Sequence, residues 1–172
     1  MKLIRSLIAA AIAALSFNAM AADVPADGTW FEFDFAEAGT PIYDLVSLDT
    51  SFSFTVSQTS LLRVVDLGFT GDRFEIYSNG QLLGQTSGAV ASFANQQFDA
   101  DLAWADNTFS KGAWTLAAGT YTITGTAFVS PLDGGYAAMS VVAVPEPGEW
   151  AMMLAGLGVL GAIARRRSIR QA

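Results

Sequence analysis

The chain has 172 residues, of which 52% are hydrophobic, and a formal net charge of −7; it contains no cysteine and no histidine. The missing residue types exclude disulfides, Ser–His and Cys–His nucleophilic sites, and histidine metal sites within this chain. Residues 22–144 carry 14 acidic and three basic side chains, a net charge of −11, which makes nucleic acid and anionic lipid poor partners. A segment of this length is enough for one domain, which must hold together by packing alone.

The first 21 residues have the pattern of a cleavable signal peptide. Two basic residues in the first five positions precede an apolar run over residues 6–17. Ala19 and Ala21 then provide the small-x-small pattern that signal peptidase recognises. We therefore expect export, with cleavage after Ala21 or one residue later, and a mature domain over residues 22–144.

Three strands are predicted in the first half of the domain. Residues 30–35 and 51–57 alternate apolar and polar side chains with period two, which is typical of half-buried strands. The side chains expected to point inward are Phe31, Phe33, Phe35, Phe52, Phe54 and Val56. Residues 61–67 form a more continuous apolar run, which predicts a central strand.

Turn signals predict two hairpins. Residues 72–84 contain two apolar runs separated by Asn79-Gly80, a pair that accepts positive φ at both central positions of a type I′ turn. Residues 114–116 and 120–128 are strand-like and flank Ala118-Gly119, which predicts a second hairpin.

Residues 94–109 allow two interpretations. Phe98, Leu102, Ala105 and Phe109 are spaced by four, three and four positions, which suits one stripe of a helix. A long loop that packs Trp104 fits the same residues. We expect a loop that contains a helical turn.

The predicted elements together indicate an all-β domain. A last strand is expected over residues 136–144, which gives about seven short strands separated by turn signals. This pattern favours an antiparallel β-sandwich, with a small β-barrel as the alternative.

Two groups of aspartates are candidate calcium ligands, because their hard carboxylate oxygens lie near predicted turns. The groups are Asp66 with Asp72, and Asp99 with Asp101 and Asp106. Neither is an EF-hand: Ala103 replaces the third loop ligand and Ser110 replaces the closing glutamate. A structural calcium ion is the only cofactor hypothesis. The alternative for Asp72 is that it only shapes the turn before its strand.

Aromatic side chains are candidates for binding sugar. Tyr77, Trp104, Trp114 and Tyr136 form a stacking platform if they are exposed on one face. The alternative is that they belong to the core, since a domain without disulfides depends on such packing.

Catalysis has few routes in this composition. A Ser–Lys dyad has to use Lys111, the one lysine left after processing, and a glycosidase needs two facing carboxyl groups. The acidic residues are spread over strand faces and loops, as on a solvated surface. We therefore expect no enzyme activity, with a carboxylate glycosidase as the alternative.

Residues 145–172 form a tail with three parts. Pro145, Glu146 and Pro147 cannot enter a helix as a unit. Residues 150–164 are uncharged and predict a membrane helix of about 22 Å, shorter than a hydrocarbon core of about 30 Å. The cluster Arg165, Arg166 and Arg167 then keeps the C-terminus cytoplasmic. Such a short span suits a temporary hold, and a permanent anchor is the alternative.

This tail resembles the PEP-CTERM sorting signal, a substrate of exosortase in Gram-negative bacteria. Residues 70–86 and 114–125 also resemble the body of small PEP-CTERM proteins of unassigned function, and jelly-roll carbohydrate-binding and pre-peptidase C-terminal sandwich domains. The resemblance implies a jelly-roll-like sandwich that is exported, held in the inner membrane by its tail, and processed by an exosortase-like enzyme at or near residues 145–147.

The resemblance further implies a destination at the cell surface or in an extracellular matrix. There the protein is expected to be a structural or adhesive component of an exopolysaccharide or biofilm matrix. The alternative functions are a carbohydrate-binding module for exopolysaccharide and the carboxylate glycosidase already considered.

Overall fold

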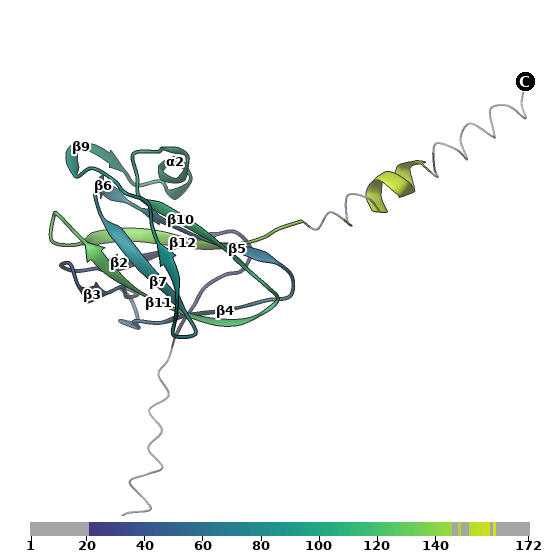
Figure 1. The fold of residues 1–172 in the computed structure, drawn as a ribbon, viewed down its shortest axis with the longest axis horizontal. Coiled ribbons are helices and arrows are strands. Elements are labelled where there is room, and N and C mark those ends of the chain that lie inside the picture. The colour runs from purple at the N-terminus through teal and green to yellow at the C-terminus, as the bar shows by residue number, and fades with distance from the viewer. Residues whose placement is uncertain (1–20, 146–147, 149–151, 159, 161–172) are drawn as a thin grey trace, which may run out of the picture.

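The computed structural model describes residues 21–145, 148, 152–158 and 160, and the domain within them is built from twelve strands and one short helix (Figure 1). The elements are β1 (Ala22–Asp23), β2 (Trp30–Phe35), β3 (Thr40–Pro41), β4 (Phe52–Val56), β5 (Ser60–Asp66), β6 (Gly68–Thr70), β7 (Arg73–Ser78), β8 (Gln81–Gln85), β9 (Ser92–Gln97), α2 (Ala100–Ala105), β10 (Lys111–Leu116), β11 (Gly119–Val129) and β12 (Gly135–Ala143). Most of the strands lie in two sheets that pack against each other.

The first sheet has six strands in the order β1-β4-β11-β7-β8, with β3 paired to β11. The second sheet has four strands in the order β10-β5-β12-β2, and β6 pairs with β9 beside it. All strand pairs are antiparallel except β1 with β4. The prediction of an antiparallel β-sandwich is confirmed.

The main core lies between the two sheets and is rich in phenylalanine. Phe33 of β2 packs edge-on against Phe74 of β7, with ring centroids 5.6 Å apart, so the contact joins the two sheets. The inward residues predicted for β2 and β4 are buried, apart from Phe31, which is half-buried and packs against the same core. Period-two alternation therefore identified the inner faces of both strands.

The hairpin predicted around Asn79-Gly80 is confirmed. Strands β7 and β8 pair with each other, and φ is 49° at Asn79 and 79° at Gly80, as a type I′ turn requires. The Asn79 side chain has a second use, because its Oδ1 accepts a hydrogen bond of 2.9 Å from the backbone N–H of Thr122 in β11.

The second predicted hairpin is wrong. The strands exist, but β10 pairs with β5 in the four-stranded sheet, while β11 pairs with β4 and β7 in the other sheet. The link between them crosses from one sheet to the other, and Leu116 at the end of β10 is buried in the core between the sheets. A short turn keeps the ends of two strands close together, but it does not decide whether the two strands pair with each other or with other strands.

The helical stripe, one of the two interpretations of residues 94–109, does not form. Phe98 and Leu102 are 56% and 57% exposed, and the buried side chains are Ala103 and Phe109. Residues 92–97 form β9, which the polar sequence did not predict, and α2 has only six residues, so no extended stripe develops. The expectation of a loop with a helical turn was nearer to the structure.

Helix α2 covers part of the outer face of the four-stranded sheet, above β5 and β12 (Figure 1). Its Ala103 packs with Val65 and Leu67 in a second hydrophobic cluster. Strand β5 is therefore buried on both faces, since Leu62 and Val64 point into the main core. This double burial explains the continuous apolar run that predicted a central strand.

The domain ends where the tail begins. Strand β12 stops at Ala143, and the backbone N–H of Val144 makes a last hydrogen bond of 2.9 Å to the carbonyl of Thr59. Pro145 is exposed and residues 152–158 are helical. Among the described residues, no helix is long and apolar enough to cross a membrane.

Several predictions concern residues that the structure does not describe. They are the signal peptide up to residue 20, including Ala19, and in the tail Glu146, Pro147, the part of the expected membrane helix outside residues 152–158 and 160, and Arg165, Arg166 and Arg167. These predictions remain as the sequence made them.

Candidate functional site

Two of the five candidate calcium ligands, Asp66 and Asp72, lie close together inside the domain. Asp66 ends β5 and has the same inward parity as Leu62 and Val64, while Asp72 precedes β7 and has the same inward parity as Phe74. Asp66 is completely buried and Asp72 is 3% exposed. One carboxylate therefore comes from each sheet, and both point into one end of the space between the sheets.

The loop between these aspartates is closed by Asp66 itself. Its Oδ2 accepts hydrogen bonds from the backbone N–H groups of Gly71, at 3.3 Å, and Asp72, at 3.2 Å. Gly71 has φ of 135°, and a Cβ at this position would lie 2.8 Å from Cα of Ala91. Only glycine fits this backbone without strain, so Gly71 is needed to place its N–H group and that of Asp72 against the Asp66 carboxylate.

One oxygen of each carboxylate has no partner. Oδ1 of Asp66 and Oδ1 of Asp72 are buried without a hydrogen bond in the described part of the chain. Burial, together with the negative charge of Asp72, raises the pKa of Asp66 to about 9. Burial also raises the pKa of Asp72 to about 6, an effect that the Ser130 hydroxyl partly offsets. Both shifts mean that two bare carboxylates are unfavourable at this place.

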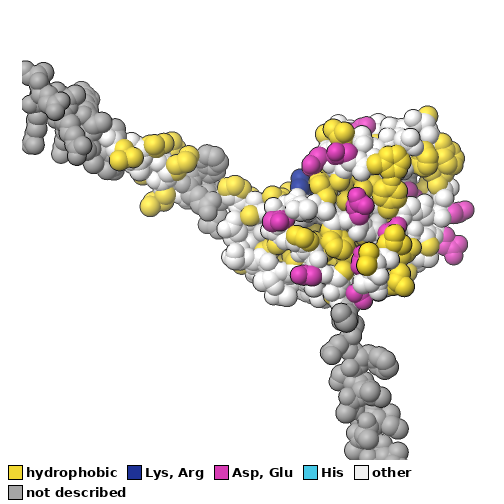
Figure 2. Space-filling view, turned by 180° about the vertical axis from the view of Figure 1, so that it is seen from behind, with side chains coloured by type: hydrophobic (Ala, Val, Ile, Leu, Met, Phe, Trp, Pro, Cys, Tyr) yellow, Lys and Arg dark blue, Asp and Glu magenta, His cyan; other side chains and the backbone are white. Residues whose placement is uncertain are grey.

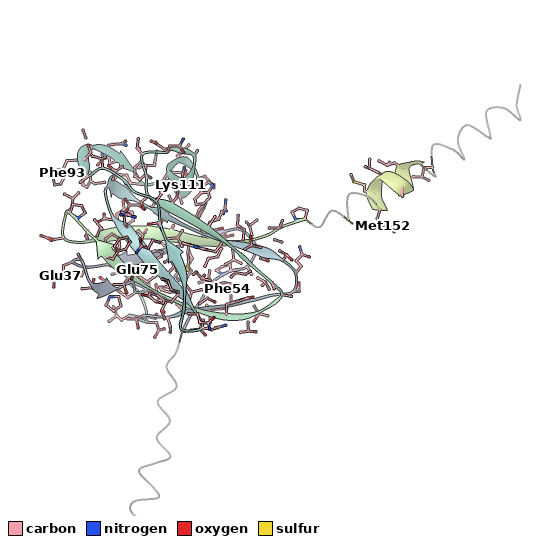
Figure 3. All side chains as sticks on the ribbon, viewed as in Figure 1. Glu37, Phe54, Glu75, Phe93, Lys111 and Met152 are labelled. Carbon is pink, nitrogen blue, oxygen red and sulfur yellow. The ribbon has the colours of Figure 1, made fainter. Side chains whose placement is uncertain are left out.

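The three basic residues of the domain make their contacts elsewhere. The Arg63 guanidinium lies over the rings of Trp30 and Trp104, at 4.4 and 5.5 Å from their centroids. Arg73 lies over the Phe128 ring, at 4.8 Å. The Lys111 ammonium donates hydrogen bonds to the carbonyls of Trp104 and Asp106, beside α2 (Figure 3).

The other three candidate calcium ligands serve local structure. Asp99 caps α2, where its Oδ1 accepts the N–H groups of Asp101 at 2.9 Å and Leu102 at 3.0 Å. Asp101 accepts the indole N–H of Trp30 at 2.8 Å, and Asp106 accepts two hydrogen bonds from Thr108. In the described residues no three acidic side chains are grouped to hold a metal ion, so a cation at Asp66 and Asp72 needs further oxygen ligands from backbone, hydroxyl or water.

The structure does not bring the four candidate glycan-stacking residues together. Trp104 and Tyr136 both border the cluster under α2, whereas Trp114 packs against the main core. Tyr77 is on β7 with outward parity, and its hydroxyl donates to Glu75 at 3.0 Å. A stacking site that uses all four is therefore not formed. Tyr77 and Tyr136 line two separate grooves, and only the groove at Tyr136 holds a second aromatic ring, that of Phe98.

This groove lies beside the outer face of β2 and β12 and has a volume of about 370 Å³. Its lining residues are Glu32, Asp34, Leu45, Phe98 and Tyr136. The rings of Phe98 and Tyr136 are stacked, 5.8 Å apart and inclined by 17°. Partial burial and the charges of Glu32 and Asp44 raise the pKa of Asp34. The surface view in Figure 2 shows acidic and hydrophobic side chains interspersed on one side of the domain.

Sequence reasoning missed most of this groove. Glu32 and Asp34 were predicted only as the solvent face of a strand, and Phe98 only as part of a helical stripe. The signal available was the alternation itself, which put both carboxylates on one face of β2. A larger hollow of about 650 Å³ near β9 was also unpredicted; its lining is uncharged and includes Thr70, Asn95 and Asn107.

Comparison with solved structures finds sandwich domains of low similarity. The pre-peptidase C-terminal domain of a Bacillus anthracis collagenase is 11% identical with a TM-score of 0.40, over 71% of this chain and 94% of that one. A family GH115 4-O-methyl-α-glucuronidase is 9% identical with a TM-score of 0.37, over 66% of this chain and 14% of that one. A Podospora anserina GH26-CBM35 β-(1,4)-mannanase is 13% identical with a TM-score of 0.32, over 72% of this chain and 29% of that one.

Comparison with protein sequences gives one informative match. No curated protein matches the chain. Residues 143–168 match the family described as the PEP-CTERM protein-sorting motif, so the match begins at the last residue of β12 and runs through the three parts of the predicted tail. The chain therefore carries a PEP-CTERM sorting motif, which indicates export and exosortase-dependent sorting to the cell surface.

Proposed function

We propose that this protein is a non-enzymatic component of the surface or extracellular matrix of a Gram-negative bacterium, with a structural or adhesive role among exopolysaccharides. The observation that carries the proposal is the sorting motif at residues 143–168. A domain that is released when its tail is cut must stay folded afterwards. The junction between domain and tail allows this, because the fold is complete before Pro145.

The junction favours release of an intact domain. The last strand pairing, between Ala143 and Ser60, and the hydrogen bond from Val144 to Thr59 both precede Pro145. Val144 is 38% exposed and Pro145 is exposed. Cleavage at or near residues 145–147 thus removes no residue that packs in the sandwich.

The proposed route has two processing steps. Signal peptidase removes the N-terminal segment after Ala21, and the tail holds the domain in the inner membrane until an exosortase-like enzyme cuts it. The mature chain then begins at Ala22, which is buried and pairs with Phe52, so the first cut also falls at the border of the fold. Both cuts therefore leave the sandwich complete.

A glycosidase is less well supported. The pair Asp66 and Asp72 has the raised pKa values that suit an acid catalyst, but the side chains are 0% and 3% exposed and offer no surface to a sugar. The groove carboxylates Glu32 and Asp34 stand on the same strand, two residues apart, and do not face each other across a cleft. Retaining and inverting mechanisms both need facing carboxyl groups.

Intact mass tests the sorting route. We would recover the protein from inner membrane, outer surface and medium, in the wild type and in a variant with Pro145, Glu146 and Pro147 changed to alanine. The expected wild-type product begins at residue 22 or 23, ends near Pro145 and co-purifies with the matrix, and the variant remains in the inner membrane with its tail. A wild-type product that still contains residues 165–172 contradicts the proposal.

A carbohydrate-binding module is the second candidate, and the stacked pair Phe98 and Tyr136 favours it. A ring beside carboxylates can stack on a sugar while the carboxylates accept its hydroxyl groups. The test is affinity electrophoresis in gels containing the exopolysaccharide of the host. Binding that Phe98→Ala abolishes and Phe93→Ala preserves supports it, because Phe93 is 71% exposed at β9 and outside the groove (Figure 3). Unretarded wild-type protein rejects it.

A further inference from the structure

We propose that Asp66 and Asp72 together bind one divalent cation, with Ca²⁺ as the best chemical match, and that this cation clamps the two sheets at one end of the sandwich. Asp66 belongs to the four-stranded sheet through β5, and Asp72 leads into β7 of the six-stranded sheet. A metal ion between them would add a second link to the hydrogen bonds that Asp66 already accepts from the N–H groups of Gly71 and Asp72.

The first argument is that each of the two carboxylates keeps an oxygen without a partner where water hardly reaches. Asp66 is completely buried and Asp72 is 3% exposed, yet Oδ1 of each lacks a hydrogen bond in the described part of the chain. A buried carboxylate oxygen without a partner costs free energy, and native proteins rarely keep two at one place. A cation supplies the missing partner to both oxygens at once.

The second argument concerns charge. Arg63, Arg73 and Lys111 are the only basic residues between positions 22 and 144, and their contacts lie with aromatic rings and with backbone, amide or hydroxyl oxygens. The described part of the chain therefore provides no positive side chain against the pair. A divalent ion balances two carboxylates completely, whereas Lys or Arg would balance one.

The third argument is the local backbone, which holds the carboxylate of Asp66 in one orientation. Its Oδ2 is fixed by the N–H groups of Gly71 and Asp72, which leaves Oδ1 as the free atom. Ser130 lies beside Asp72, and Gly135 approaches the same carboxylate: a Cβ there would lie 3.8 Å from Oδ2 of Asp72. A hydroxyl and a glycine backbone beside the Asp72 carboxylate suit a hard cation that completes its shell with neutral oxygens.

The chemistry favours Ca²⁺ over Mg²⁺ and over transition metals. Hard carboxylate and hydroxyl oxygens select alkaline-earth ions, and the domain has no His or Cys to attract softer ones. The backbone has positive φ at Gly71, beside Asp66, and at Asp133 and Gly134, soon after Ser130, and Ca²⁺ accepts irregular ligand geometry where Mg²⁺ demands a near-ideal octahedron. Two carboxylates correspond to a weak extracellular-type site, with Kd in the range of about 10⁻⁴–10⁻³ M.

The test measures thermal unfolding and calcium binding of the purified full-length chain in detergent. After EDTA treatment, CaCl₂ at about a hundredfold excess over Kd is expected to raise Tm by about 5–15 °C, with one ion per chain in titration calorimetry. Asp66→Asn and Asp72→Asn keep the side-chain shape and are each expected to abolish both responses. Asp99→Asn and Asp106→Asn are the matched controls and should retain both.

Hydrogen exchange of the wild-type protein provides a readout that does not depend on the folding of a variant. Calcium is expected to protect backbone amides of residues 66–73 and 130–136 by at least tenfold. Three outcomes overturn the proposal: no calcium response of the wild type, protection centred on residues 99–106, or a variant Asp66→Asn that raises Tm in EDTA and still binds calcium. The last result would mean that Asp66 and Asp72 share a proton and that calcium binds elsewhere.

Discussion

The two groups of candidate aspartates differ in burial, in their place in the fold and in their hydrogen bonds. Asp66 and Asp72 are buried, belong to different sheets and keep one unpaired oxygen each. Asp99, Asp101 and Asp106 are not buried, lie around one short helix and accept hydrogen bonds from their neighbours. In the sequence both groups look like acidic residues near turns.

Position in the strand explains the difference. Asp66 and Asp72 continue the inward parity of β5 and β7, so the alternation that buries Val64 and Phe74 also buries them. The α2 aspartates follow no such alternation and remain at the surface. A buried carboxylate needs a partner, and an exposed one already has water, so only the first group requires an explanation beyond local structure.

The largest expected effect is the pH dependence of the metal-free protein. Burial raises the pKa of Asp66 to about 9 and of Asp72 to about 6, both above the usual 3.8. The folded state then holds protons that the unfolded chain releases, so the stability from this pair is complete below about pH 4 and is lost as pH rises towards 9. The loss amounts to at most about 1.4 kcal/mol per pH unit for each group.

Calorimetry in EDTA between pH 5 and pH 9 measures this loss. We expect Tm of the wild type to fall steadily and to recover at pH 8 when CaCl₂ is added. Tm of Asp66→Asn should fall only up to about pH 6, where Asp72 finishes titrating, and then stay nearly constant. The lowered pKa values of Asp27, Asp44 and Asp106 act with the opposite sign, below about pH 4, and do not enter this range. A wild-type Tm that is constant from pH 5 to pH 9 would contradict the burial argument.

A substitution at Gly71 is expected to disturb the backbone around Asp66 and Asp72. Gly71→Ala places a Cβ 2.8 Å from Cα of Ala91 at φ of 135°, and it disturbs the N–H groups that hold Asp66. We expect a loss of about 3 kcal/mol in the free energy of unfolding, from strain and overpacking together.

Denaturant unfolding with Gly88→Ala as control checks this. Gly88 is in the loop before β9, is exposed, and has no atom within 4 Å of an added Cβ, so its change should leave stability within about 0.5 kcal/mol. Equal effects of the two substitutions would show that the conformation of Gly71 is not required.

The sequence predicted the sandwich because its strands alternate clearly and its best turn has one dominant solution. Phe33, Phe54 and the Asn79-Gly80 turn are local signals that the fold preserves. The pairing of β10 and β11 was mispredicted because partner choice depends on the whole sheet. Strand β9 was missed because its residues 92–97 are mostly polar and pair only with the three-residue strand β6.

The candidate sites also divide into those with a local sequence signal, which were predicted, and those that depend on long-range contacts, which were not. The sorting motif was predicted from residues 145–167 and the family match confirms it, because a linear motif carries its chemistry in its order along the chain. The pairing of Asp66 with Asp72 was suggested by their nearness in sequence, but their burial required the two-sheet geometry. The groove of Glu32, Asp34 and Phe98 joins segments more than 60 residues apart, and no local pattern contains that contact.

The smallest change in stability is expected in the aspartate group around α2. It sharpens the contrast between an exposed capping aspartate and the buried pair. Asp99→Ala removes the cap that accepts the N–H groups of Asp101 and Leu102, which should cost about 1 kcal/mol of unfolding free energy. Asp99→Asn keeps an accepting oxygen and should cost almost nothing, whereas the same change at Asp66 removes a charge on which the clamp depends. Denaturant unfolding of both Asp99 variants in EDTA and in calcium measures the difference. If the cost of Asp99→Ala appears only in calcium, this group also binds the ion and the division between the two groups fails; if it is the same in both, α2 uses its aspartate purely as a cap.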